Sequence, residues 1–214
     1  MDQNAVITVH ILHTGLLSGH EERLLGRIAP CYALKYRRMK CESAKKQELG
    51  AGFLLAKHLD VLSDEALFFN ESGKPFLKRS ETAPSPPEFS LSHAGDYVVL
   101  AVSKEPVGVD IERADRVKLS VLKCVLPAKM YERLEAQDTA EEEKTFHRGK
   151  AWTSVEAVLK AEGCGLFAEL RKDPGFMECW HLESFRMDGG HVISVASAHP
   201  FHLRRITEKN AILA

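Results

Sequence analysis

The chain has 214 residues, of which 44% are hydrophobic and 28% carry a charged side chain. That balance is ordinary for a globular protein, and the length allows one large domain or two small ones with a substantial core. The formal net charge is −1, so no global field points to nucleic acid as a partner. Any ionic partner must be recognised by a local patch.

Neither a targeting segment nor a membrane span is predicted. The start of the chain has no basic region leading into an apolar stretch, and no run approaches the roughly 18 apolar residues of a transmembrane helix. The five cysteines are odd in number, and none forms a CxxC pair. We therefore expect reduced thiols, a cytoplasmic location and no contact with a membrane.

In the first half, β-branched residues predict a strand over 5–12, and HEERLLGRIAP predicts a short helix ended by Pro30. The stretch 35–59 has helical spacing, basic first and apolar later. ALFFNESGKPFL predicts a strand followed by a turn, and APSPP (83–87) a rigid loop. Residues 89–103 predict two strands joined by a tight turn.

The second half opens with a predicted strand, VGVDIE (107–112). Helices are predicted around 117–124, 127–136 and 140–162. Thr139 and Glu142 suggest a capping box at the start of the third helix, and Gly163 its end. Residues 179–198 predict a hairpin turned at DGG.

A weak internal echo links the two halves. Residues 94–103 and 189–198 both read as small residues followed by an apolar strand. We expect an α+β fold of two similar α/β subdomains, 1–104 and 105–214, in a pseudo-twofold arrangement. Each would hold a small antiparallel sheet with helices, a size that suits a subdomain.

Two acids share one face of the strand 107–112. Because side chains alternate along a strand, Asp110 and Glu112 lie opposite the apolar residues, about 6.6 Å apart along the strand. In the later helix, Trp152, Glu156 and Lys160 follow at i, i+4 and i+8. Each pattern also has a plain structural interpretation, as a solvated strand face and as a surface ion pair.

Taken together, the pieces resemble the 4'-phosphopantetheinyl transferases of the Sfp type. The resemblance rests on GVDIE followed by W-x-x-x-E-A-x-x-K-x-x-G-x-G-L. Three further stretches precede these motifs in the order that the family shows: a basic helix, GKP (73–75) and SLSHAGDYVVLAV (90–102). The resemblance therefore covers roughly residues 30–170. The family transfers the phosphopantetheine arm of coenzyme A to a serine of an acyl or peptidyl carrier protein and releases 3',5'-ADP.

The resemblance implies roles for residues of the second subdomain. Asp110, Glu112 and Glu156 would be the carboxylates on the side of a Mg²⁺ ion, which prefers oxygen ligands. Glu156 is the implied general base, and Lys160 would add positive charge near the diphosphate. The active site would lie at the interface of the two subdomains, and three acids converging there would need a cation.

Other residues would bind coenzyme A on the side of the first subdomain. The family pattern favours Lys35, Lys46 and Lys74 for phosphate contacts, and Ser92 and His93 near the 3'-phosphate. One departure is Val155, which stands where the motif usually has lysine, and this predicts either compensation by a neighbouring basic residue or weaker turnover.

Several alternatives stay open. Val155 is compatible with a non-catalytic module that binds coenzyme A or a carrier protein, and the three acids are compatible with a Mg²⁺-dependent phosphohydrolase. The histidine pairs 10/13 and 199/202 suggest zinc only weakly, and Cys164 reads as a loop thiol without catalytic duty. A basic segment between Glu112 and Glu142 is the expected docking area for an acidic carrier protein, and we expect a monomer.

Overall fold

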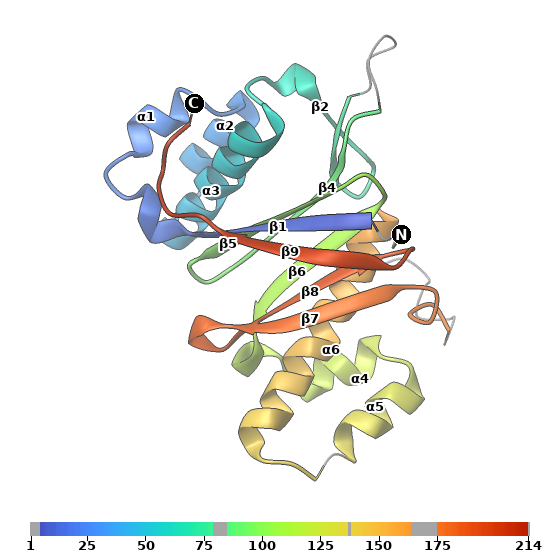
Figure 1. Cartoon of the computed structure of the whole chain (residues 1–214). Helices are drawn as coiled ribbons and strands as arrows, with labels where there is room; N and C mark the ends of the chain where they lie inside the picture. The colour runs from blue at the N-terminus through green and yellow to red at the C-terminus, as the bar shows by residue number, and fades with distance from the viewer. Residues whose placement is uncertain (1–4, 79–84, 137, 164–174, 214) are drawn as a thin grey trace.

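The protein is described by a computed structural model over residues 5–78, 85–136, 138–163 and 175–213. Two main β-sheets pack against each other, and each carries a long helix on its outer side (Figure 1). This is the mixed α and β architecture that the sequence predicts. None of the helices within these ranges combines the length and apolarity needed to cross a bilayer.

The first sheet has four strands. In spatial order they are β4 (Glu88–Ala94), β5 (Tyr97–Ser103), β1 (Ala5–His13) and β9 (Phe201–Thr207). β5 runs antiparallel to both of its neighbours, whereas β9 pairs with β1 in parallel. The first sheet is therefore not purely antiparallel as expected, because a strand from the end of the chain joins its edge.

Three helices cover the outer face of this sheet. They are α1 (Glu21–Leu25), α2 (Pro30–Arg38) and α3 (Glu42–Leu59). The apolar second half of α3 contributes Leu49, Phe53 and Leu54, none of them exposed, to a core shared with Leu12 and Leu100 of the sheet. Burial of such side chains is the main stabilising term, about 1.5–3 kcal/mol for each large one.

The second sheet has three antiparallel strands. Their spatial order is β6 (Val107–Arg113), β8 (His191–Ser197) and β7 (His181–Met187). Apolar residues of β6 and β8, such as Val109 and Val195, meet Val9 and Val99 of the first sheet in one buried cluster. The two sheets thus share a core between them.

Helices α4 (Leu119–Val125), α5 (Ala128–Glu135) and α6 (Glu141–Glu162) belong to the second sheet. α6 lies along β6 and β8 and buries Val155 and Val158 there. It ends where predicted, because Gly163 adopts the left-handed conformation (φ 77°) that glycine tolerates best.

A short hairpin stands apart from both sheets. It consists of β2 (Leu67–Phe69) and β3 (Pro75–Leu77), which pair antiparallel around the predicted turn. Its turn residues reach the end of α6, as described below.

The two main sheets repeat one connectivity. The chain runs β1, α3, β4, β5 in the first and β6, α6, β7, β8 in the second, with the spatial orders β4-β5-β1 and β7-β8-β6. The echo seen in the sequence falls on β5 and β8, which hold equivalent places. We propose on this ground that the halves 1–104 and 105–214 form a pseudo-twofold repeat, to which β9 is an addition that crosses back to the first sheet.

Three local expectations were wrong. The helical stretch 35–59 is divided between α2 and α3, with a break at residues 39–41. Pro30 begins α2 instead of ending a helix, because its fixed φ suits a first helical position. The capping box does not form, since the N-cap of α6 is Ala140 and no side chain caps it.

Candidate active site

At Gly108 and Asp110, the polar face of β6 is covered by helix α6. A Cβ atom at Gly108 would lie 1.8 Å from the carbonyl oxygen of Ala157 in α6, so only glycine permits this approach. Asp110 shares the face of Gly108 and is 6% exposed. The plain interpretation of this face as solvated is therefore wrong.

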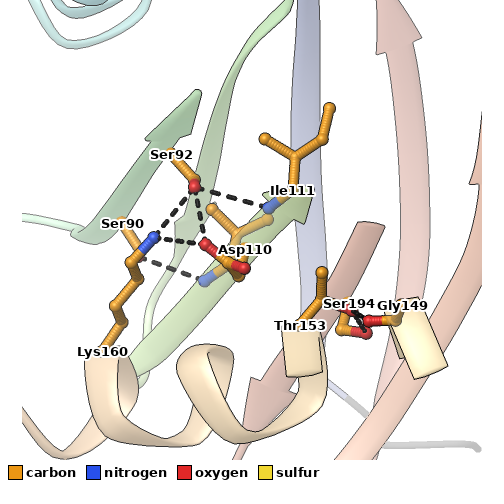
Figure 2. A network of polar contacts seen from close by, with 9 residues as sticks. Ser90, Ser92, Asp110, Ile111, Gly149, Thr153, Lys160 and Ser194 are labelled. Atoms are coloured by element: carbon orange, nitrogen blue, oxygen red, sulfur yellow. Dashed lines mark hydrogen bonds and ion pairs between the residues drawn. The ribbon is translucent and has the colours of Figure 1, made fainter. Parts of the chain in front are cut away.

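Asp110 is held in a compact network of hydrogen bonds (Figure 2). Its Oδ1 accepts hydrogen bonds from Ser92 Oγ at 2.7 Å and from Lys160 Nζ at 2.7 Å. Lys160 Nζ also donates to Ser92 Oγ at 2.9 Å. This network joins β4, β6 and α6. It brings together Ser92, Asp110 and Lys160, three of the residues that the motifs indicated.

Two serine hydroxyls attach β4 to β6, although these strands belong to different sheets. Val109 N donates to Ser90 Oγ at 3.1 Å, and Ile111 N donates to Ser92 Oγ at 3.4 Å. The i, i+2 spacing places both hydroxyls on one face of β4. Ser90 was not among the predicted site residues, and this spacing was the signal that could have found it.

Glu156 lies on the face of α6 that also carries Lys160. Its Oε1 is buried and has no hydrogen-bond partner among the described residues. Burial raises the pKa of the Glu156 carboxyl above its usual range, and the nearby Asp110 raises it further, while Lys160 opposes the shift. A buried carboxylate oxygen without a partner is costly, so this atom is suited to receive a proton or a cation.

A cavity of about 500 Å³ opens over these groups. Helices α2 and α3, strands β4 and β6 and helix α6 all contribute to its walls, so both halves of the chain line it. Among the described residues, its carboxylates are Glu48, Asp110, Glu112 and Glu156, and its ammonium groups are Lys35 and Lys160. When ionised, four acids face two lysines.

The donor set fits a hard divalent cation. Asp110, Glu112 and Glu156 supply carboxylate oxygens to one cavity. Counting only the residues that the structure describes, acids outnumber lysines there and one oxygen of Glu156 lacks a partner. The donor atoms of these three acids do not all lie within 4.8 Å of one another. Within the described residues, only a different group, discussed below, meets that condition. Mg²⁺ commonly binds through one or two carboxylates and completes its coordination with substrate phosphates and water. The wider separation of these acids is compatible with that mode of binding.

The position of α6 is set at two points. In the middle of the helix, Thr153 Oγ1 lies 2.7 Å from Ser194 Oγ, and Ser184 Oγ of β7 lies 2.8 Å from the same oxygen. Ser194 is the cross-strand partner of Asp110 in the sheet. This hydroxyl cluster therefore fixes the helix directly beside the acid (Figure 2).

At its C-terminal end, α6 is held by the β2–β3 hairpin. Asn70 Nδ2 donates to the carbonyl of Gly163 at 2.6 Å, and Lys74 Nζ donates to the carbonyl of Lys160 at 2.5 Å. Lys160 lies in the last turn of α6 and Gly163 is its C-cap, where carbonyl oxygens lack the usual acceptor role toward an amide four residues further along the helix. Asn70 was missed by the sequence analysis, since nothing local to it signals this long-range contact.

The candidate phosphate ligands divide into two groups. Lys35 and His93 line the 500 Å³ cavity. Lys74 lines an adjoining cavity of about 290 Å³ that also touches Glu156 and Lys160. Lys46 lines neither, and its Nζ lies 3.5 Å from Ser18 Oγ.

Val155 points away from both of these cavities. It is 2% exposed and belongs to an apolar cluster with Leu122 and Leu126 of the α4 region. In this chain the position contributes to packing between helices. Cys164, the remaining motif thiol, lies outside the described residues.

Comparison with protein families gives one match. The model of the 4'-phosphopantetheinyl transferase superfamily matches residues 106–196, which include β6 and the whole of α6. The match therefore covers Asp110, Glu112, Glu156 and Lys160, but not the residues of the first half.

Curated proteins extend the similarity to that half. 4'-phosphopantetheinyl transferase Sfp of Bacillus subtilis (strain 168) is 28% identical over 152 residues, which are 64% of this chain and 65% of that protein. A second 4'-phosphopantetheinyl transferase of Bacillus subtilis is 25% identical over 206 residues, 86% of this chain and 88% of the relative. 4'-phosphopantetheinyl transferase AcpT of Salmonella typhimurium is 32% identical over 118 residues, 54% of this chain and 57% of the relative. The aligned part of the chain thus spans slightly less than two thirds of Sfp and most of the second relative.

Proposed function

Because the chain belongs to the 4'-phosphopantetheinyl transferase superfamily, we propose that it transfers the phosphopantetheine arm of coenzyme A to a serine of an acyl or peptidyl carrier protein. The products are the holo-carrier protein and 3',5'-ADP. The observation that carries the proposal is the cavity lined by both halves, where a buried oxygen of Glu156, without a partner in the described ranges, lies near the Lys160–Asp110 pair.

Glu156 is the proposed general base. Its raised pKa makes it a better proton acceptor than an ordinary carboxylate once it is ionised. The serine oxygen forms a bond to the phosphorus that carries the arm, and the bond from that phosphorus to the ADP oxygen breaks. The serine proton passes to Glu156, and ADP leaves with the bonding electron pair.

Lys160 is the proposed electrostatic partner of the departing phosphate. Its ammonium group is already oriented by Asp110 and Ser92, so little reorganisation is needed when negative charge develops nearby. Asp110, Glu112 and Glu156 would hold Mg²⁺, which when bound supplies charge neutralisation at the diphosphate. Lys35 and His93 are proposed to contact phosphates of coenzyme A from the opposite wall.

The carrier protein is proposed to dock on the surface between Glu112 and Glu142. This segment contains 3-10 helix η3 (Ala114–Arg116), α4 and α5. It exposes basic side chains, as expected for contact with an acidic partner: Arg116, Lys118, Lys123 and Lys129. We further propose that the protein acts as a monomer in the cytoplasm, like an enzyme that carries both halves of its site in one chain.

The test is the intact mass of an apo-carrier protein after incubation with the enzyme, coenzyme A and Mg²⁺. Transfer adds about 340 Da, the mass of the arm that the coenzyme carries, and EDTA in place of Mg²⁺ prevents it. A panel of acyl and peptidyl carrier proteins identifies the one served. An unchanged mass with every carrier favours a binding module, and degradation of coenzyme A without a carrier favours a phosphohydrolase.

The Glu156→Gln variant tests the base within the same assay. Glutamine keeps the shape of the side chain but cannot accept the serine proton, so transfer is abolished while coenzyme A still binds by calorimetry. Wild-type turnover in this variant would remove Glu156 from the role of base.

A further inference from the structure

A second group of ionisable side chains lies away from the candidate active site. His10 comes from β1, His58 from the end of α3, and Glu208 follows β9 directly. His58 Nε2 lies 2.8 Å from Glu208 Oε1, and His10 Nδ1 lies 3.4 Å from the same oxygen. One donor atom from each residue falls within 4.8 Å of the others.

Two side chains of this group, His10 and Glu208, are buried, and one donor atom has no partner among the described residues. Glu208 is 7% exposed and His10 is 8% exposed. Within the part of the chain that the structure describes, His10 Nδ1 is enclosed without a hydrogen-bond partner, since its distance to Glu208 exceeds that of a good hydrogen bond. Leaving a buried ring nitrogen unpaired costs about 1–3 kcal/mol.

Both rings are available as neutral donors. Burial lowers the pKa of His10 to about 4, and burial also lowers that of His58. The rings are stacked with their centroids 3.5 Å apart, and one nitrogen of each lies within 3.4 Å of Glu208 Oε1. Two neutral imidazoles and a carboxylate form a donor set typical of borderline divalent metals and foreign to Mg²⁺.

We propose that His10, His58 and Glu208 bind one transition-metal ion of the Zn²⁺ class, with water in the fourth position. Coordination in the planes of both rings requires the rings to turn out of their stack. His58 borders a cavity of about 1000 Å³, which leaves room for that movement and a path for the ion. The histidine pairs 10/13 and 199/202 do not form this site, because only His10 of the four belongs to the group.

The positive charge of Lys57 disfavours binding of a metal ion at this group, and its removal therefore tests the proposal. Its Nζ lies 2.6 Å from Glu208 Oε2, on the oxygen that the histidines do not face. The positive charge of Lys57 so close to the carboxylate lowers the affinity of the group for a cation. Removing its charge should therefore tighten metal binding.

The consequence of binding is structural. Glu208 N already donates to the carbonyl of Ile11 at 2.8 Å, and the residues after it run along the helices of the first half (Figure 1). A metal at Glu208 would fasten this C-terminal segment to β1 and α3. The site is independent of the proposed transferase chemistry, because none of its ligands lines the candidate active-site cavity.

The experiment uses the full chain, purified without a histidine tag, stripped with EDTA and kept in millimolar Mg²⁺ to occupy carboxylate sites. Titration with ZnCl₂ by calorimetry should give one ion per chain, and saturation should raise the Tm by about 5 °C, as expected for a ligand selective for the native state. Co²⁺ in place of Zn²⁺ should give the visible absorption of a four-coordinate site. No binding above the Mg²⁺ background would overturn the proposal.

Variants assign the ion to its ligands. His58→Gln and Glu208→Gln should each weaken Zn²⁺ binding at least about tenfold, whereas His181→Gln, at an exposed strand position, should leave it unchanged. Lys57→Met should bind Zn²⁺ more tightly than the wild type. Equal affinity in His58→Gln, or unchanged or weaker binding in Lys57→Met, would contradict the assignment.

Discussion

The hydroxyl of Ser92 connects three elements of the candidate site. It donates to Asp110 Oδ1, accepts from Lys160 Nζ and also accepts from Ile111 N. A side chain this short has few rotamers, so it holds the lysine and the acid in one arrangement at little entropic cost. Ser92 is therefore a positioning residue for Lys160 in the proposed reaction, besides its predicted place near the 3'-phosphate.

Ser92→Ala should lower kcat for transfer by about tenfold or more, because a misplaced charge loses much of its effect on the transition state. Ser90→Ala is the matched control, as its hydroxyl receives Val109 N on the same face of β4. Equal losses in both variants would show that the serines act only by joining the strands.

Cysteine reactivity gives a prediction that does not depend on catalysis. A hydrogen bond with the side chain of Ser43 lowers the pKa of the exposed Cys41 thiol, and the backbone at the start of α3 lowers it further. Burial raises the pKa of Cys31 to about 11. The thiolate is the reactive form, so the two thiols should differ strongly near neutral pH.

At pH 7.5, iodoacetamide should modify Cys41 at least about tenfold faster than Cys31, as followed by peptide mass spectrometry. Since its pKa is lowered, the rate at Cys41 should level off at a lower pH than that of an ordinary thiol, while the rate at Cys31 keeps rising toward pH 11. Ser43→Ala should slow the reaction of Cys41 and leave the exposed Cys124 unchanged. Similar rates at Cys41 and Cys31 would refute the assignment.

At the scale of elements, α6 contributes both to the core and to the lining of the candidate active-site cavity. One side buries Val155, Val158 and Leu159 in the core, and another presents Glu156 and Lys160 to the cavity. The helix can lie against β6 only because Gly108 has no side chain. The glycine of the GVDIE motif is thus a condition for bringing the acids of the strand to the helix.

Gly108→Ala should destabilise the protein by about 3 kcal/mol or more, since its methyl group would overlap the backbone of α6. Urea unfolding measures the change, and transfer activity should fall with it as the helix is pushed away. Gly26→Ala is the control, because a Cβ there would meet no atom closer than 3.8 Å. Comparable stability of the two variants would contradict the described approach of α6 to β6.

At the scale of the whole molecule, the end of the chain stabilises the beginning. Ala211 and Leu213 belong to the core cluster of the first half. Arg23 Nη2 and Arg27 Nη1 donate to their carbonyls, each at 3.0 Å. With β9 paired to β1, the last residues complete the first half from outside its own span.

Leu213→Ala should therefore cost about 2 kcal/mol of unfolding free energy, the usual loss for a large buried side chain. The neighbouring Ile212→Ala should cost less than about 0.5 kcal/mol, because Ile212 is 60% exposed. Thermal or urea unfolding compares the pair. Equal effects would mean that the C-terminal segment does not pack as described.

Much of the local structure of this protein could be predicted from its sequence. Alternation along 107–112 predicted which residues of β6 share a face, and helical spacing predicted that Glu156 and Lys160 lie together on α6. Both patterns follow from fixed backbone periods of two and 3.6 residues, which need no knowledge of distant contacts. The turn at Gly163 and the hairpin at DGG were predictable for the same reason, because glycine at positive φ is a local requirement.

Only the tertiary structure could decide which separate segments meet. Nothing near Asn70 or Lys74 in the sequence indicates that their side chains hold the end of α6, and nothing near Lys46 shows that it lies outside the cavity. The group of His10, His58 and Glu208 joins residues from both ends of the chain. Such contacts arise when packed sheets and helices bring together backbone positions that are far apart in the sequence. The spacing of residues along the chain does not determine the distance between them in space.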